Sequence, residues 1–221
     1  MVFPVVGGRD PSEGYDVSRS LRYYATDQFE SRTPSSAGNR RTWTWSGWIK
    51  NTESSNGNAF NLWGGGDDVN NRAHIDWNTN GTFQVEAKNG GTTKLKHEGS
   101  TNVSDPNAWY HVVWRLDTTD GTSANRSRVY INNIQVVFSN LGTTPSQNDE
   151  LAINNTVLHA IGKRTYADQN YFGGYLCEVH FTDGTSYAPT AFGKYDSNGV
   201  WVPIDAKDDL SYGTNGYYLE F

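Results

Sequence analysis

The sequence predicts an all-β protein, built as a sandwich or a barrel, and three observations support this prediction. Runs in which apolar and polar residues alternate recur about every ten residues, and alternation is the period of a strand rather than of a helix. Turn-forming Gly and Asn residues separate these runs. Aromatic residues make up 14% of the chain and glycine occurs 23 times, whereas methionine occurs once, a composition that favours strands and turns over helices.

The clearest strands lie between residues 109 and 138. In the stretch 109–116, aromatic and aliphatic residues occupy every second position, which predicts a strand. The stretch 128–138 is rich in β-branched and aromatic residues, and Asn132-Asn133 in its middle tolerates the positive φ of a tight turn. We therefore expect a long hairpin followed by a short one, whose apolar face a second sheet must cover.

Residues 1–18 show no such alternation and are expected to form an extended N-terminal arm. Two prolines and three glycines lie within residues 1–17, and only the short apolar run 2–6 could bury side chains. An arm of this kind becomes ordered through a partner. Residues 19–221 are expected to form one domain, because β sandwiches of this length commonly remain undivided. A domain of this size buries roughly 70% of its unfolded surface, so it needs no disulfide or metal to stay folded.

Local patterns place the other elements along the chain. The stretch 42–50 puts Trp43, Trp45 and Ile49 on one side and is expected to be a core strand. A flexible polar loop is expected at 64–71, where three glycines precede Asp and Asn residues. Further strands are expected at 20–24, 29–32, 59–63, 73–77, 83–87, 92–97, 157–162, 171–181 and 217–221, with a loop at 140–149 and one helical turn at 189–192. The last strand is expected to pair with the first, because a terminal strand is usually tied into a sheet.

Charge and cysteine content exclude several classes of partner. The formal net charge is −6 and the isoelectric point is near 5.3, so we expect no nucleic-acid partner. The single cysteine, Cys177, excludes an intrachain disulfide framework, and residues 1–20 lack the pattern of a secretory signal. Both observations fit assembly in a reducing cytoplasm. Because no apolar run approaches membrane-spanning length, no membrane partner is expected.

Four segments carry a resemblance to a known family. They are 40–50 (RRTWTWSGWIK), 109–113 (WYHVV), 171–184 (YFGGYLCEVHFTDG) and 212–221 (YGTNGYYLEF). In this order, over about residues 20–221, they resemble the laminin-G-like, concanavalin A-like lectin/glucanase domains of structural proteins from bacteriophages, particularly marine ones. The resemblance implies a two-sheet antiparallel jelly-roll sandwich and a virion location. One departure is that these domains often have Asn-Gly where this chain has Asn132-Asn133, and Asn also tolerates positive φ.

The wider superfamily of these sandwiches includes retaining glucanases, whose signature strand carries Glu-x-Asp-x-x-Glu or Glu-x-Asp-x-Glu. The segment at Glu178 departs from this signature, because His180 replaces the middle Asp. Thr182 replaces the last carboxylate, or Asp183 carries it on the other face. Retaining hydrolysis needs two carboxyl groups roughly 5 Å apart, which a regular strand does not provide here. We therefore expect no enzyme and a solvated polar face at Glu178, His180 and Thr182.

Carbohydrate recognition uses aromatic faces beside Asn, Asp or Arg side chains on loops of a rigid scaffold. The predicted loop and its surroundings offer this chemistry at Trp63, Asp67, Asp68, Asn70, Asn71, Arg72, Trp77 and Tyr166. The alternative is that the two tryptophans belong to the core and that the Asp and Asn residues only form turns. Calcium is the metal to expect, at Asp67 and Asp68 or at Asp117 and Asp120, because it prefers hard oxygen ligands. No other cofactor is required.

These observations lead to a non-enzymatic bacteriophage virion protein, assembled in the host cytoplasm, of the tail-fibre, head-fibre or decoration type. Its sandwich is expected to be displayed on the particle and to bind host-surface glycans, while residues 1–17 attach it to other virion proteins. Fibre proteins are often trimeric, so a homo-oligomer is expected, although no heptad repeat indicates a coiled-coil stem. The alternatives are a glycan-cleaving enzyme and a capsid decoration without a ligand.

Overall fold

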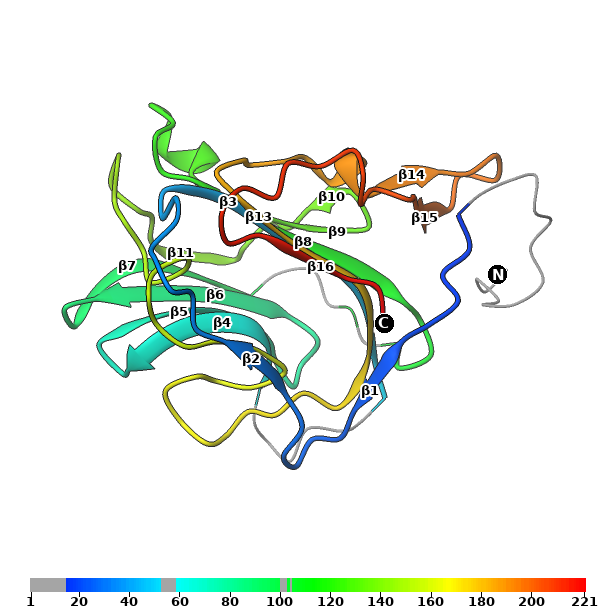
Figure 1. The fold of residues 1–221 in the computed structure, drawn as a ribbon, viewed down its shortest axis with the longest axis horizontal. Coiled ribbons are helices and arrows are strands. Elements are labelled where there is room, and N and C mark those ends of the chain that lie inside the picture. The colour runs from blue at the N-terminus through cyan, green and yellow to red at the C-terminus, as the bar shows by residue number, and fades with distance from the viewer. Residues whose placement is uncertain (1–14, 53–58, 100–102, 104) are drawn as a thin grey trace.

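The computed structural model describes residues 15–52, 59–99, 103 and 105–221. Within these residues two seven-stranded antiparallel sheets pack face to face, and a two-stranded hairpin lies outside them (Figure 1). The predicted all-β, two-sheet sandwich is therefore confirmed. No helix among the described residues is both long enough and apolar enough to cross a membrane.

The first sheet contains the strands that the sequence showed most clearly. Its order is β1 (Leu21–Tyr23), β13 (Gly174–Asp183), β3 (Thr42–Asn51), β8 (Tyr110–Asp117), β9 (Ser127–Ile131) and β10 (Ile134–Gln135), and β16 (Tyr217–Leu219) also pairs with β13. Asn132 and Asn133 have φ of 49° and 67°, so the tight turn between β9 and β10 is confirmed.

The predicted pairing of the last strand with the first is wrong. Both strands pair with β13 instead, β1 along residues 174–176 and β16 along residues 179–181. A bulge between Cys177 and His180 separates the two pairings. The two short strands therefore occupy successive parts of one edge of β13. They follow each other along that edge and do not lie side by side.

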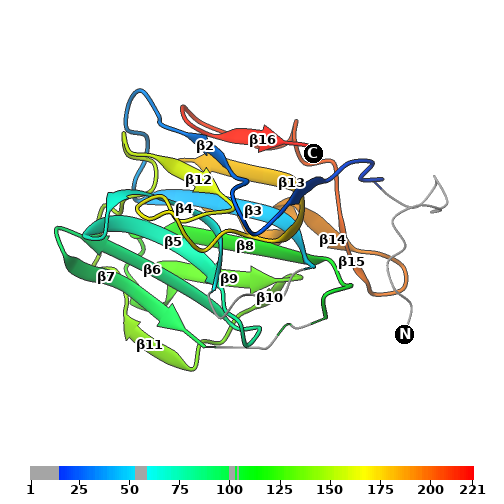
Figure 2. The ribbon, with the colours of Figure 1, turned by 90° about the horizontal axis from the view of Figure 1, so that it is seen from below.

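The second sheet is ordered β11 (Asn140–Thr143), β7 (Thr92–Glu98), β6 (Phe83–Asn89), β5 (Asn71–Trp77), β4 (Phe60–Asp68), β12 (His159–Ile161) and β2 (Glu30–Arg32), as Figure 2 shows. The predicted loop at 64–71 is wrong, because strand β4 continues to Asp68 and β5 begins at Asn71. The predicted loop at 140–149 likewise begins with a strand, β11.

The glycines of β4 allow neighbouring strands to approach closely. A Cβ atom on Gly64 would lie 2.6 Å from the carbonyl oxygen of Ala73, and one on Gly65 would lie 2.6 Å from the ring of His159. The absence of side chains thus lets β5 and β12 pack tightly against β4. This is why the glycine run forms a strand and not a flexible loop.

Tryptophans fill the space between the two sheets. Trp43, Trp45 and Trp114 from the first sheet and Trp63 from the second are at most 1% exposed. The rings of Trp43 and Trp114 meet edge to face, with centroids 4.8 Å apart, and those of Trp45 and Trp63 stack 5.8 Å apart. Aromatic pairs of this geometry contribute beyond their buried area. The core strand predicted at 42–50 is confirmed.

The outer face of the first sheet is covered by the chain between residues 184 and 215. This segment contains η2 (Pro189–Ala191), which is the predicted helical turn, and the hairpin of β14 (Gly193–Tyr195) and β15 (Trp201–Pro203); a second 3-10 turn, η1 (Ser123–Asn125), lies elsewhere (Figure 1). The expected solvated face at Glu178, His180 and Thr182 is therefore wrong. All three residues are at most 3% exposed. The covering segment contacts His180 and Thr182, whereas Tyr15 and Tyr218 contact the carboxylate of Glu178.

The predicted N-terminal arm lies mostly outside the described residues. Residues 1–14 belong to that undescribed part, so the extended arm and its attachment role stay predictions. At its end, Val17 packs against a small cluster of Trp48, Cys177 and Trp201. The hydroxyl of Tyr15 donates a hydrogen bond to Oε1 of Glu178 at 3.0 Å. The described end of this stretch thus lies against the first sheet.

Candidate functional site

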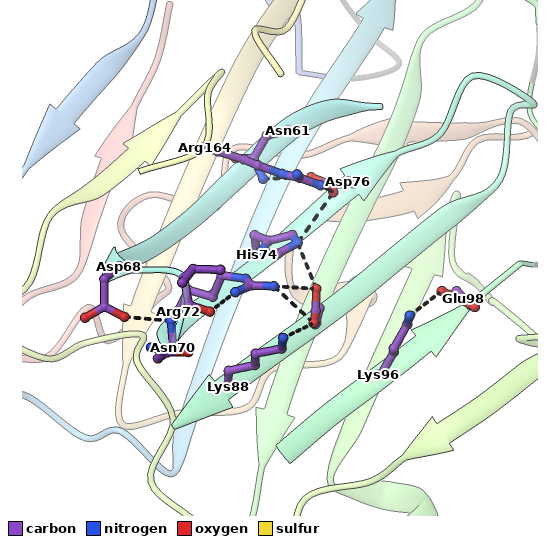
Figure 3. Close-up of polar contacts among 12 residues, drawn as sticks. Asn61, Asp68, Asn70, Arg72, His74, Asp76, Lys88, Lys96, Glu98 and Arg164 are labelled. Carbon is purple, nitrogen blue, oxygen red and sulfur yellow. Dashed lines mark hydrogen bonds and ion pairs between the residues drawn. The ribbon is translucent and has the colours of Figure 1, made fainter. Parts of the chain in front are cut away.

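A polar cluster lies on the outer face of the second sheet, the face directed away from the core (Figure 3). It comprises Asn61, Arg72, His74, Asp76, Glu86 and Arg164. Strand alternation places it there, because the intervening residues Ala73, Ile75 and Trp77 of β5 are core residues. Its members come from β4, β5, β6 and the loop that follows β12.

Two arginines hold the two carboxylates of the polar cluster. Nη2 of Arg72 lies 3.2 Å from Oε2 of Glu86, and Nη2 of Arg164 lies 2.6 Å from Oδ2 of Asp76. Asn61 donates from Nδ2 to Oδ1 of Asp76 at 2.8 Å. Both ion pairs are largely buried, which strengthens the attraction between their charges.

His74 lies between these two ion pairs and is 2% exposed. Its Nε2 atom is 3.5 Å from Oδ2 of Asp76 and 3.8 Å from Oε2 of Glu86, too far for a direct hydrogen bond. Burial lowers the pKa of His74, which favours the neutral ring. The imidazole is thus a neutral polar group between two charged pairs.

The polar cluster concentrates buried polar atoms that have no hydrogen-bond partner. Within the described residues ten buried side-chain atoms lack one, and five of them are in this cluster. They are Oδ1 of Asn61, Nε of Arg72, Nδ1 and Nε2 of His74, and Nε of Arg164. Buried polar atoms are normally paired, so this concentration marks a place where a polar ligand or bridging water would be favoured.

Tyr166 packs against the polar cluster from the loop 163–170. Its ring centroid is 4.6 Å from the guanidinium carbon of Arg72 and 5.9 Å from that of Arg164, both within reach of a cation–π interaction. The same ring lies 6.0 Å from the ring of His74. Burial raises the pKa of Tyr166, so its hydroxyl stays protonated at neutral pH. The aromatic ring of Tyr166 therefore lies beside the polar side chains of the cluster.

The structure brings together two of the predicted glycan-binding residues, Arg72 and Tyr166, at the contact just described. Asp67, Asp68 and Asn70 are exposed at the end of the β4–β5 hairpin, where Oδ1 of Asp68 accepts hydrogen bonds from the backbone nitrogens of Asn70 and Asn71. These bonds lower the pKa of Asp68 and close the turn.

Two predicted residues do not face a ligand. Trp63 and Trp77 are 1% and 3% exposed in the core, so their predicted stacking on sugars is wrong and the alternative interpretation holds for them. Their large apolar surface is buried between the sheets because they fall on the inward parity of their strands.

Sequence reasoning named only Arg72 and missed the other five members of the polar cluster, which are Asn61, His74, Asp76 and Glu86 on strands and Arg164 on a loop. The signal for His74 and Asp76 was present, because alternation along 71–77 puts them on the same face as Arg72. No local signal pointed to Arg164, which reaches Asp76 from 88 residues along the chain.

Three of the acidic residues predicted for calcium accept hydrogen bonds from neighbouring backbone nitrogens. Oδ1 of Asp120 accepts from the backbone nitrogen of Thr122 at 2.7 Å, and Oδ1 of Asp117 accepts from that of Thr119 at 3.0 Å. Asp68 is engaged by the turn at Asn70 in the same way. In the described parts of the chain, no group of three or more His, Cys, Asp or Glu residues could hold a metal ion. Calcium takes six to eight oxygen ligands, which include backbone carbonyls and water, so calcium at these residues stays a prediction.

Asp76, Glu86 and Glu178 are poorly arranged for glycoside hydrolysis. Asp76 and Glu86 are each held in an ion pair by an arginine, so neither is a free carboxyl group beside a substrate. Glu178 is 3% exposed and accepts hydrogen bonds from the hydroxyls of Tyr15 and Tyr218, at 3.0 and 2.9 Å. Burial raises its pKa. Glu178 is therefore enclosed by Tyr15 and Tyr218 and is not open to a substrate.

The two-sheet sandwich and its polar outer face define a lectin-like domain. Residues 25–189 match the family model Laminin_G_3, described as the Concanavalin A-like lectin/glucanases superfamily. The chain therefore belongs to this family, as its four sequence segments indicated. No curated protein matches the chain.

Solved structures share the fold at low sequence identity. The heptameric SAP-like pentraxin from Limulus polyphemus is 15% identical, with 91% of each chain covered and a TM-score of 0.52. The CBM40 of the Ruminococcus gnavus IT-sialidase is 11% identical over 72% of this chain and 88% of its own, with a TM-score of 0.50. Tailspike protein 2 of bacteriophage CBA120 is 15% identical over 73% of this chain and 25% of its own, also with a TM-score of 0.50. These likenesses establish the fold alone.

Proposed function

We propose that this chain is a non-enzymatic glycan-binding protein and that the polar cluster with Tyr166 is its binding face. The observation that carries this proposal is the concentration of unpaired buried polar atoms beside an aromatic ring. Sugars present hydroxyl groups to polar side chains and C–H surfaces to aromatic rings, so such a combination suits them. Membership of a lectin/glucanase superfamily supports the same conclusion.

The ion pairs of this face suit a hydroxyl-rich ligand. Arg72 and Arg164 are each neutralised by a carboxylate. The more exposed Lys96 pairs with Glu98 at 3.3 Å on β7. Lys88 lies 3.9 Å from the carboxylate of Glu86, which Arg72 also contacts, so donors and acceptors alternate over short distances with one more base than acid. Neighbouring hydroxyls of a sugar can donate to the carboxylates and accept from the basic groups.

Glycan binding is tested by screening the chain on an array of neutral and acidic glycans and measuring the best ligand by titration calorimetry. Tyr166→Ala removes the aromatic ring and is expected to weaken glycan binding about tenfold. Tyr195→Ala is the matched control, because Tyr195 is 49% exposed on the hairpin that covers the other sheet. Failure of every glycan to bind the folded protein would overturn the proposal, as would equal affinities for the two variants.

The absence of enzyme activity is part of the proposal. It is supported by the arginine partners of Asp76 and Glu86 and by the enclosure of Glu178. Incubation with the glycans that bind is expected to release no reducing sugar. Release by the wild type that is lost in Glu178→Gln would favour the alternative, a glycan-cleaving enzyme.

We further propose that the domain is displayed on a bacteriophage particle assembled in the host cytoplasm, as a tail fibre, head fibre or decoration protein that binds host-surface glycans. The support is the resemblance of the four sequence segments at 40–50, 109–113, 171–184 and 212–221. Residues 1–17 would attach the domain to other virion proteins. Mass spectrometry of purified particles tests this role, and particles without the chain would refute it. A decorated particle whose domain binds no glycan would support the alternative of decoration without a ligand.

A further inference from the structure

Three of the most exposed aliphatic side chains of the described structure lie in one short stretch, residues 134–143. Ile134 is 69% exposed, Val137 is 78% exposed and Leu141 is 64% exposed. Ile134 belongs to β10, the last strand of the first sheet, and Leu141 belongs to β11, the last strand of the second. The chain therefore crosses from one sheet to the other here and forms the edge of both (Figure 2).

This edge carries no charged residue. Residues 129–148 contain no Asp, Glu, Lys or Arg, although such residues make up 19% of the chain. Free edge strands are usually protected from pairing by charged side chains, especially Lys. The opposite end of the second sheet follows that rule, because β2 has the exposed sequence Glu-Ser-Arg. The uncharged edge is thus a particular feature of the 134–143 side.

We propose that the edge formed by residues 134–143 is an interface between two copies of this chain. No described strand pairs with the outer side of β10 or β11, so their backbone groups are available to an extended partner. A two-fold axis would bring the stretch against its own copy, as in the self-complementary interface of most dimers.

Charge favours a second copy as the occupant of this edge. Each chain has a formal net charge of −6, so contact between copies through most other surfaces would bring like charges together. Contact through residues 129–148 brings no charge of this stretch against another. An acidic or basic partner, in contrast, would find no opposite charge here to pair with. A two-fold contact predicts a dimer, or a larger assembly made of dimers, in place of the trimer expected from fibre proteins.

The test is the molar mass of the purified chain, measured by sedimentation over a wide range of concentration. We expect a reversible dimer. Val137→Lys and Leu141→Lys place like charges across the two-fold contact and should raise the dimer dissociation constant by roughly tenfold or more. Val69→Lys is the matched control, because Val69 is an aliphatic residue 55% exposed at the β4–β5 turn, in the middle of the second sheet. It should leave the dimer intact.

The unfolding midpoints of all three variants are expected to match the wild type, since exposed positions tolerate such changes. A wild-type chain that stays monomeric at every concentration would overturn the proposal, and would leave a different protein as the partner of this edge. A dimer that survives Val137→Lys and Leu141→Lys would overturn it equally. The dimer test is independent of glycan binding, because Tyr166→Ala leaves this edge unchanged and should leave the dimer dissociation constant unchanged.

Discussion

The outer faces of the two sheets both bury a histidine, but they satisfy it differently. On the first sheet, His111 is fully buried under the segment 184–215. On the second sheet, His74 is almost as buried, beside the loop 163–170 that carries Tyr166. The two faces therefore compare a polar layer under a long covering segment with one beside a shorter loop.

Every polar atom of the His111 ring has a partner. Nε1 of Trp201 donates to its Nδ1 at 3.1 Å, so Nε2 carries the proton and donates to Oγ of Ser46 at 2.8 Å. His180 on the same face is bonded through Nδ1 to the hydroxyl of Tyr212 at 2.9 Å. The covering segment thus supplies hydrogen-bond partners for both histidines that it buries.

His74 has no such partner, although two ion pairs surround it. The loop beside it contributes the ring of Tyr166 and the guanidinium of Arg164, and neither hydrogen-bonds to the imidazole. Burial alone therefore does not identify a polar residue as purely structural. A covered face with satisfied atoms is built for stability, whereas a face with unsatisfied atoms has hydrogen-bonding capacity left for a ligand.

Acid is expected to have the largest effect on both faces. All five histidines are buried, and burial lowers the pKa of each, to about 3 for His111 and His180 and about 4 for His159. The unfolded chain binds these protons near pH 6.5, so the stabilisation present above that pH is lost as pH falls. Between pH 7 and pH 5, His111, His159 and His180 should each lower the free energy of unfolding by about 2 kcal/mol. Urea denaturation across this range measures the loss, and a stability that stays constant would contradict the expectation.

Replacing each histidine by leucine should separate the two faces. His111→Leu leaves the hydroxyl of Ser46 and the indole of Trp201 unpaired, and should reduce the free energy of unfolding by about 2 to 4 kcal/mol. His74→Leu removes a ring without hydrogen bonds and should change it by less than about 1 kcal/mol. Chemical denaturation of both variants gives the two values. Equal losses would show that the faces do not differ.

A smaller effect is expected at Glu178, where the covered face holds a carboxylate. Burial raises its pKa above the ordinary value of 4.5, so the wild type loses stability as pH rises through the folded-state pKa. Glu178→Gln keeps an acceptor for Tyr15 and Tyr218 without the charge, and should be more stable than the wild type at alkaline pH by less than about 1 kcal/mol.

The control for this change is Glu178→Ala, which removes the acceptor and should destabilise the chain at every pH. Thermal melts at acidic and alkaline pH measure both variants. A gap between Gln and wild type that shrinks as pH rises would be the wrong sign for a buried carboxylate.

The smallest effect is expected from chelation, which should change neither face. The carboxylates of Asp68, Asp117 and Asp120 are engaged by backbone donors, so a chelator should leave the melting temperature unchanged. A bound ion at 100 times its dissociation constant would contribute about 2.7 kcal/mol, which a melt detects easily. A clear drop in the melting temperature with chelator would restore calcium as a ligand.

Much of the architecture was readable because it depends on neighbours in sequence. Alternation identified the strand at 42–50 and the hairpin on either side of Asn132-Asn133, since side-chain direction and turn conformation are local properties. The glycines of β4 were interpreted as a loop, although they allow β5 and β12 to approach β4 closely. The sequence does not reveal which strands will be neighbours.

The candidate site likewise combines residues placed together by the strand pattern with residues brought there only by the fold. The sequence placed Arg72, His74 and Asp76 on one face of a strand by itself, although only Arg72 was recognised as functional. Tertiary structure alone brought Arg164 and Tyr166 to that face, and it alone buried Glu178 against Tyr15 and Tyr218. Period-two patterning fixes which side chains share a face of a sheet. What covers that face depends on long-range packing, and the cover decides whether a polar residue becomes part of the core or stays available to a ligand.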